Sequence, residues 1–121
     1  MEKAVKIVDI EKYDISDNVN VFEVNDIKTW LDKATRVGLV NSITIEKNAG
    51  HTTTTLYLNS LPLVLPVDSA LSILSQIELY AIDCYRVTEA HKLAVKQSTV
   101  IEDVINYDIT LDYPAHPKFT L

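Results

Sequence analysis

The sequence predicts an α+β fold: a small, mostly antiparallel sheet with one short helix, then a long amphipathic helix and a short C-terminal helix. Three observations predict it. Segments rich in β-branched residues and separated by turn residues fill the first half of the chain. Residues 69–97 contain neither proline nor glycine, and their apolar side chains recur at helical spacing. The length of 121 residues fits a single domain.

The first half is expected to begin with two strands, residues 4–10 and 19–24, separated by the turn-rich residues 14–18. A short helix should follow over residues 26–37. Asn25 is placed to cap the N-terminus of this helix, and Gly38 should end it. Trp30 lies on its apolar face.

The hairpin that the sequence predicts most clearly joins residues 41–47 to residues 52–58 through the turn at 48–50. Both segments are rich in β-branched residues, and Ile43 and Ile45 share one face of the first. Residues 61–67 should form a last strand. Pro62 and Pro66 donate no backbone hydrogen bond, so this strand should lie at an edge or end at a proline.

The second half is expected to be helical. Asp68 is placed to cap a helix over residues 69–97, which would be about 40 Å long at 1.5 Å per residue. Thr99 and Glu102 have the spacing of a capping box for a short helix that ends near Tyr107. The proline-punctuated tail from residue 112 should be extended.

The long helix carries a heptad seam, because its inward positions are spaced alternately by four and three residues. A wider set of apolar residues flanks this seam, so the helix offers two apolar faces and needs two partners. We expect the sheet to cover one face and a second copy of the chain to cover the other, in a trimer or a dimer. The alternative is that the whole seam lies in the core of a monomer. The expected interface consists of Leu74, Ile77, Ala81, Cys84, Thr88, His91 and Val95.

Composition excludes several classes of function. Seventeen acidic and eleven basic residues give a net charge of −6, which argues against binding to a nucleic-acid backbone. One cysteine excludes a disulfide framework or a multi-thiolate metal site, and two separated glycines exclude a phosphate-binding loop. No segment resembles a signal peptide or a membrane-spanning helix, so we expect a soluble protein with no cofactor.

Side chains capable of chemistry are present, but they form no catalytic motif. Cys84 and His91 share the seam two helical turns apart, too far for direct contact within one helix. A buried structural thiol and a hydrogen-bonded histidine are the expected roles, and His91 is also a candidate pH switch. The acids Glu78, Asp83 and Glu89 are expected on the solvated side of the helix, and Tyr107, Tyr113 and Phe119 are expected as packing anchors.

Residues 68–119 resemble a family of bacteriophage virion proteins that occur in tail-fibre-associated and other structural genes, including those of Bacteroides and crAss-like phages. The matching stretches are YAIDCYRVTEAHKLAV and TVIEDVINYDITLDYPAHPKF. The matching positions in the first are Tyr80, Ala81, Cys84, Tyr85, Thr88, His91, Ala94 and Val95. Those in the second are Val104, Tyr107, Asp108, Thr110, Tyr113, Pro114 and Phe119. The chain departs from the pattern at Ile109, at Leu111–Asp112 and at Glu102, which is shifted by one position.

The resemblance implies a virion structural protein, made in the host cytoplasm, such as a short head or tail fibre component or a capsid accessory protein. It implies assembly with capsid, portal or tail proteins, and no catalytic residue. The β-rich residues 1–67 would then dock to the particle, and the helical residues 68–121 would form the oligomer. Two alternatives are a small acidic adaptor or anti-defence protein, favoured by a continuous stripe of carboxylates, and a small enzyme with a subunit-interface site that uses Cys84 and His91.

Overall fold

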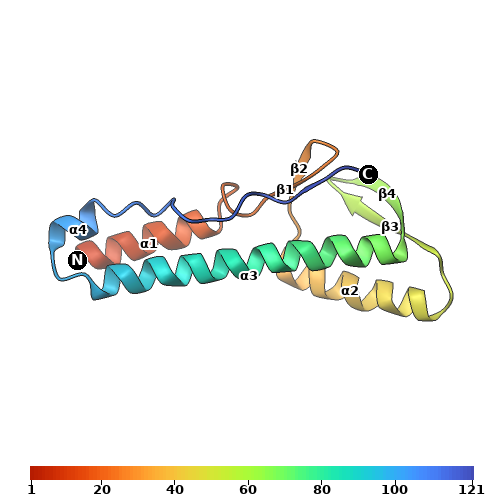
Figure 1. Cartoon of the computed structure of the whole chain (residues 1–121), viewed down its shortest axis with the longest axis horizontal. Coiled ribbons are helices and arrows are strands. Elements are labelled where there is room, and N and C mark those ends of the chain that lie inside the picture. Colours follow the sequence, from red (N-terminus) through yellow and green to blue (C-terminus); the bar gives the residue numbers. More distant parts are fainter. The chain divides into compact units, whose positions relative to one another are not determined.

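The computed structural model describes residues 1–121 and confirms the α+β fold class, with four helices and five short strands (Figure 1). The helices are α1 (Glu2–Asp14), α2 (Lys33–Asn48), α3 (Val67–Gln97) and α4 (Ile101–Ile105). The strands are β1 (Phe22–Val24), β2 (Ile27–Thr29), β3 (Thr53–Leu58), β4 (Leu61–Pro66) and β5 (Lys118–Phe119). None of the helices combines the length and apolarity that a membrane crossing needs.

The chain divides into two compact units, and α3 contributes to both. The helical unit comprises Met1–Val21 and Tyr80–His116, and therefore holds α1, α4 and the second part of α3. The mixed unit comprises Phe22–Leu79 and Pro117–Leu121, and holds α2, all five strands and the first part of α3.

The helical unit is built around a small apolar core of Ile10, Val95 and Val104, which come from α1, α3 and α4. Two lysines of α1 satisfy carbonyls near the ends of the other helices. Lys3 Nζ donates to the Lys96 carbonyl at 2.8 Å, and Lys6 Nζ donates to the Ile105 carbonyl at 3.0 Å. These long-range contacts join α1 to the C-terminal ends of α3 and α4.

The mixed unit contains two small sheets. In the first, β1 pairs antiparallel with β2 and parallel with β5, in the order β2-β1-β5. In the second, β3 and β4 form an antiparallel hairpin. Both hairpins turn through two residues with positive φ, Asn25 and Asp26 in the first and Asn59 and Ser60 in the second, which is the pattern of a type I′ turn.

The core of the mixed unit joins both sheets to α2 and α3. Phe22, Ile43 and Ile77 are almost completely buried there. The aromatic rings of Phe22 and Phe119 meet edge to face with centroids 6.1 Å apart, which fixes β5 against β1.

The first predicted strand, residues 4–10, is wrong: these residues lie in α1. Val5, Ile7 and Val8 suggested a strand because of their β-branched side chains. However, Ile7 and Ile10 are one helical turn apart, and their packing against α3 and α4 decides the conformation.

The predicted short helix over residues 26–37 and the predicted strand over residues 41–47 are also wrong. Asn25 lies in the β1–β2 turn, and the helix begins after Asp32, whose carboxylate accepts a 2.8 Å hydrogen bond from the Thr35 N–H. Gly38 lies inside α2 rather than at a stop. The hairpin that does form joins residues 53–58 to residues 61–66.

The helical second half is largely confirmed. The long helix spans Val67–Gln97, so Asp68 lies within its first turn rather than capping it. The short helix α4 spans only Ile101–Ile105, its N-cap residue is Val100, and no side chain caps it, so the predicted capping box does not form. The tail begins in a turn at Asp112, which has a positive φ, and only Lys118–Phe119 form a strand, β5. Strand β4 has an unpaired edge, as its prolines predicted. Residues 1–67 are not β-rich, because α1 and α2 together outnumber the strand residues there.

Candidate functional site: an apolar groove between α2 and α3

The mixed unit has an apolar groove of about 510 Å³ between α2 and α3. Its exposed aliphatic side chains are Val37, Val40 and Leu79. Leu74 forms part of its lining and belongs to the buried core below. The residues that line it are Arg36, Val37, Val40, Asn41, Leu74, Ser75, Glu78 and Leu79.

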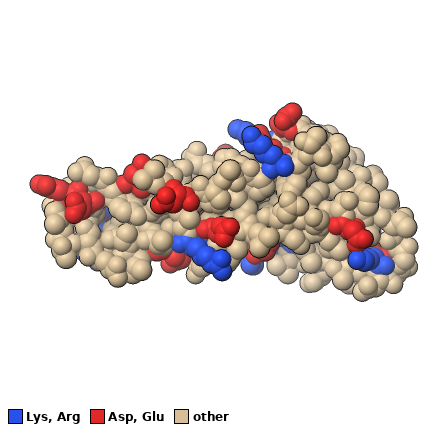
Figure 2. All heavy atoms as spheres, in the orientation of Figure 1, with Lys and Arg blue, Asp and Glu red and all other residues tan.

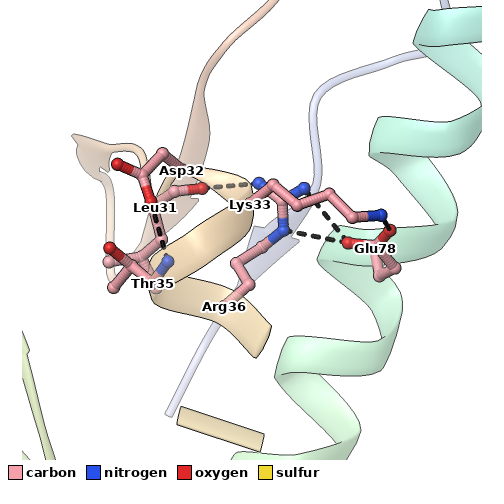
Figure 3. A network of polar contacts seen from close by, with 6 residues as sticks. All are labelled: Leu31, Asp32, Lys33, Thr35, Arg36 and Glu78. Atoms are coloured by element: carbon pink, nitrogen blue, oxygen red, sulfur yellow. Dashed lines mark hydrogen bonds and ion pairs between the residues drawn. The ribbon is translucent and has the colours of Figure 1, made fainter. Parts of the chain in front are cut away.

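One end of the groove is held by the buried side chain of Arg36 (Figure 3). Its Nε donates to the Glu78 carboxylate at 3.1 Å, and a terminal nitrogen donates to the Leu31 carbonyl at 2.6 Å. Its guanidinium carbon also lies 5.2 Å from the centroid of the Trp30 ring. A buried guanidinium requires such partners, and here they join α2 to α3 and to the segment before α2.

Lys33 supplies a second cation at the same end (Figure 3). Its Nζ lies 2.7 Å from the Glu78 carboxylate, and its side chain is 69% exposed. The hydrogen bond from Lys33, followed by those from Arg36, lowers the pKa of Glu78 against the opposing effect of burial. Two cations therefore share one carboxylate, and Lys33 is the one that solvent reaches.

A second ion pair joins the two helices at their other ends, where Lys47 Nζ lies 2.7 Å from the Asp68 carboxylate. Contacts from Lys33 to Glu78 and from Lys47 to Asp68 show that α2 and this part of α3 run antiparallel. The groove between them is thus a fixed apolar surface with a cation at one end, a form that suits an apolar segment of another protein.

The predicted interface residues on α3 are placed mostly in the interior of the single chain. Leu74 and Ile77 belong to the core of the mixed unit. In the helical unit Cys84, Thr88, His91 and Val95 are buried, and Ala81 is half-buried. The heptad seam therefore has partners within its own chain, as the monomer-core alternative expected, and these side chains do not lie on a surface that a second copy would meet.

His91 has the hydrogen-bonded structural role that was expected of it. Its Nε2 lies 2.8 Å from the Leu111 carbonyl, which only accepts, so Nε2 carries the proton. The Nδ1 atom of the same ring forms a 2.6 Å hydrogen bond with the Tyr107 hydroxyl. Both ring nitrogens of His91 are thus occupied by the segment that follows α4.

Thr88 ties the same segment to α1. Its hydroxyl donates to the Asp14 carboxylate at 2.7 Å and, having only one proton, accepts from the Tyr113 hydroxyl at 2.7 Å. The rings of Tyr13 and Tyr113 also meet with centroids 5.5 Å apart. Tyr107 and Tyr113 are therefore anchors of the C-terminal segment, as predicted.

Cys84 is a buried thiol whose pKa is raised, chiefly by desolvation. Its neighbour Tyr80 donates a 2.6 Å hydrogen bond to the Val19 carbonyl, and burial likewise raises the pKa of that phenol. A nucleophilic thiol needs the opposite shift and a free base. The arrangement therefore gives Cys84 and His91 structural roles.

The carboxylates do not gather into one continuous stripe on the face shown in Figure 2, where acidic side chains lie in separate places with lysine and arginine among them. Of the three acids expected on the solvated side of the helix, Glu78 is instead engaged by Lys33 and Arg36. No group of three or more His, Cys, Asp or Glu side chains lies close enough together to hold a metal ion.

The groove residues were not predicted as a site, because the predicted elements placed Val37 and Val40 outside a common helix with Ile43. One signal was present: Arg36 stands at helical spacing from Leu39 and Ile43, and a charge on an apolar face requires a buried partner. Comparison of the chain with protein-family models, with curated proteins and with solved structures finds no match.

Proposed function

We propose that this chain is a structural subunit of a bacteriophage virion and that it acts by binding other proteins rather than by catalysis. The observation that carries the proposal is the preformed apolar groove between α2 and α3, where Val37, Val40 and Leu79 are exposed to solvent. Exposed apolar surface of this kind is typical of protein-binding sites.

The partner that suits the groove is an amphipathic helix with a carboxylate beside its apolar face. A third helix fits between two antiparallel helices because its side chains enter the groove at intervals of three and four residues. Lys33 at the end of the groove favours an acidic side chain, since two cations there share the single carboxylate of Glu78.

A place in a virion is supported by the resemblance of residues 68–119 to phage virion proteins. An adaptor that mimics nucleic acid receives no support from the separate acidic patches of Figure 2. An enzyme built on Cys84 and His91 receives none either, because the thiol is buried and both ring nitrogens are bonded.

The experiment is mass spectrometry of purified particles of a phage whose genome encodes this chain, with stoichiometry measured against the major capsid protein. We expect a fixed number of copies per particle that survives washing in high salt. Complete absence of the chain from particles, with its presence in the soluble fraction of infected cells, would overturn the proposal and favour the adaptor.

A further inference from the structure

The hairpin of β3 and β4 (Figure 1) has two free edges, because neither strand pairs with a strand outside the hairpin. Its hydrogen bonds alternate along each strand. The two-residue turn makes Leu58 and Leu61 a hydrogen-bonded pair, and at the other end the Val67 N–H donates to the Thr52 carbonyl at 3.1 Å. The even-numbered residues of β3 therefore bond to β4, and the odd-numbered residues turn their N–H and C=O groups outward.

The outer edge of β3, formed by Thr53, Thr55 and Tyr57, carries unpaired backbone groups. All three residues are exposed, and no hydrogen bond of the folded chain uses their N–H or C=O groups. The edge therefore presents three donors and three acceptors, at the alternate spacing of a strand that lacks its neighbour.

The free edge of β4 is blocked. Its outward positions include Pro62 and Pro66, which have no N–H, so Val64 is the single donor between them. Proline is one of the devices that prevent a foreign strand from adding to a sheet, and charged side chains are another. Residues 52–58 contain neither. The hairpin is thus protected on one edge and open on the other.

We propose that the outer edge of β3 receives an extended segment of another protein, which adds to the hairpin as a third strand. Only another extended backbone offers acceptors and donors that match this row of groups. The inference goes beyond the proposed function, because it adds a binding surface separate from the groove between α2 and α3 and does not require that the chain belong to a virion.

A second copy of the chain does not suit this edge, because the inner face of β3 rests on α2. The Thr54 hydroxyl donates to the Glu46 carboxylate at 2.8 Å, and Leu56 shares the core with Ile43. Two copies paired antiparallel through β3 would each bring an α2 beneath the joined strands. Neighbouring strands lie about 4.8 Å apart, whereas a helix with its side chains is about 10 Å across. The occupant is therefore a segment with no helix behind it.

The outer face of the hairpin indicates which side chains the segment carries. Tyr57 is 67% exposed and Val64 is 65% exposed, and Pro62 lies on the same face, opposite Tyr57. Cross-strand pairs of β-branched and aromatic side chains stabilise such a surface. We therefore expect an uncharged segment with β-branched or aromatic residues at alternate positions, and no proline where its backbone faces β3.

The test uses amide hydrogen exchange followed by NMR, with the synthetic peptide KTTTTLYLK as the probe. It repeats residues 52–58 of the chain as an isolated strand, flanked by lysines for solubility. In the free chain the amides of Thr53, Thr55 and Tyr57 should exchange fast. Millimolar peptide should slow these three by at least about tenfold, because each gains an acceptor.

Two methylated peptides control for side-chain contacts. When Thr55 lies opposite its counterpart, the peptide nitrogens equivalent to Thr53, Thr55 and Tyr57 face the edge. Methylation of these nitrogens removes the donors and should abolish binding. Methylation of the nitrogens equivalent to Thr54 and Leu56, which face solvent, should retain it.

A matched pair of variants tests the edge itself. Thr55→Pro removes an outward donor from β3 and should weaken peptide binding at least about tenfold. Val64→Pro makes the same change at the position directly opposite on β4 and should bind the peptide like the wild type. Circular dichroism checks that both are folded, and the methylated peptides test the edge independently of either variant.

Unchanged exchange at the three amides in millimolar peptide, or equal binding of the two methylated peptides, would overturn the inference. Slowing of the same amides with rising protein concentration and no peptide would overturn it in favour of a second copy. Because no phage particle is used, failure here is distinguishable from failure of the proposed function, which the composition of purified particles tests.

Discussion

The Nδ1 atom of His91 lies 2.6 Å from the Tyr107 hydroxyl, and this contact closes the segment after α4 onto α3. His91 lies at a heptad position of α3, and its hydrogen-bond partner Tyr107 belongs to the same chain. The same holds for Thr88, three residues earlier, whose partners come from α1 and from the C-terminal segment. The polar part of the seam therefore specifies how one chain folds.

Replacing His91 with leucine should destabilise the helical unit. The change removes both hydrogen bonds and leaves the Leu111 carbonyl without its donor, which costs about 2–3 kcal/mol of unfolding free energy. Urea unfolding followed by circular dichroism measures the loss. Tyr85→Phe, at an exposed position of the same helix, is the control and should change stability little. Equal stability of both variants would contradict the structural role of His91.

Thr88 and Tyr113 should be energetically coupled. Their hydroxyls lie 2.7 Å apart, so a double-mutant cycle with Thr88→Val and Tyr113→Phe should give a coupling of about 0.5–1.5 kcal/mol. Strict additivity of the two single losses would show that the hydrogen bond adds no stability. Each variant keeps the shape of its side chain closely, so packing changes contribute little.

Arg36 and Lys33 contact the same carboxylate but should differ in their effect on stability. Arg36→Met removes a buried cation with three partners and should cost about 2–3 kcal/mol, because the Leu31 carbonyl and the Trp30 ring lose their contacts. Lys33→Met removes an exposed cation and should cost less than about 1 kcal/mol. Thermal unfolding compares the two, and a larger loss for Lys33→Met would contradict the burial of Arg36.

The Glu78 carboxylate should make stability depend on pH. Its pKa is lowered in the folded chain, chiefly by the hydrogen bond from Lys33, so the stabilisation is present above its ordinary pKa. It is lost as the pH falls through the lowered folded pKa. The difference in unfolding free energy between wild type and Glu78→Gln should be less than about 1 kcal/mol at pH 7, because Glu78 is partly exposed, and should shrink as the pH falls through the lowered pKa. If the difference in unfolding free energy between wild type and Glu78→Gln grew as the pH fell, it would contradict this prediction.

Cys84 should react slowly with thiol reagents in the folded chain. Burial raises the pKa of the thiol, which lowers the thiolate fraction at pH 8 and also restricts access. Labelling with a chromogenic disulfide in buffer and in denaturing urea measures both states, and we expect the rate to rise sharply on unfolding. Rapid labelling of the folded chain would show that the thiol is accessible.

The long helix could be predicted from the sequence because its apolar period extends over 31 residues without proline or glycine. Helices α1 and α2 could not, since segments such as NSITIEK satisfy strand alternation and helical spacing equally well over seven residues. Their conformation depends on packing far along the chain, as Ile43 in the core of the mixed unit shows. The burial of the α3 seam could be predicted in the same way, but its partners could not, because spacing does not distinguish a second copy from a distant segment of the same chain.

The central claim is that the groove between α2 and α3 binds another protein of the particle. Its most direct test is the amount of this chain in purified particles when Val40 is replaced by aspartate, with Ile45→Asp on another face of the same helix as the control. We predict that Val40→Asp lowers incorporation severalfold, whereas Ile45→Asp retains the wild-type level. Equal incorporation of both folded variants would contradict the claim.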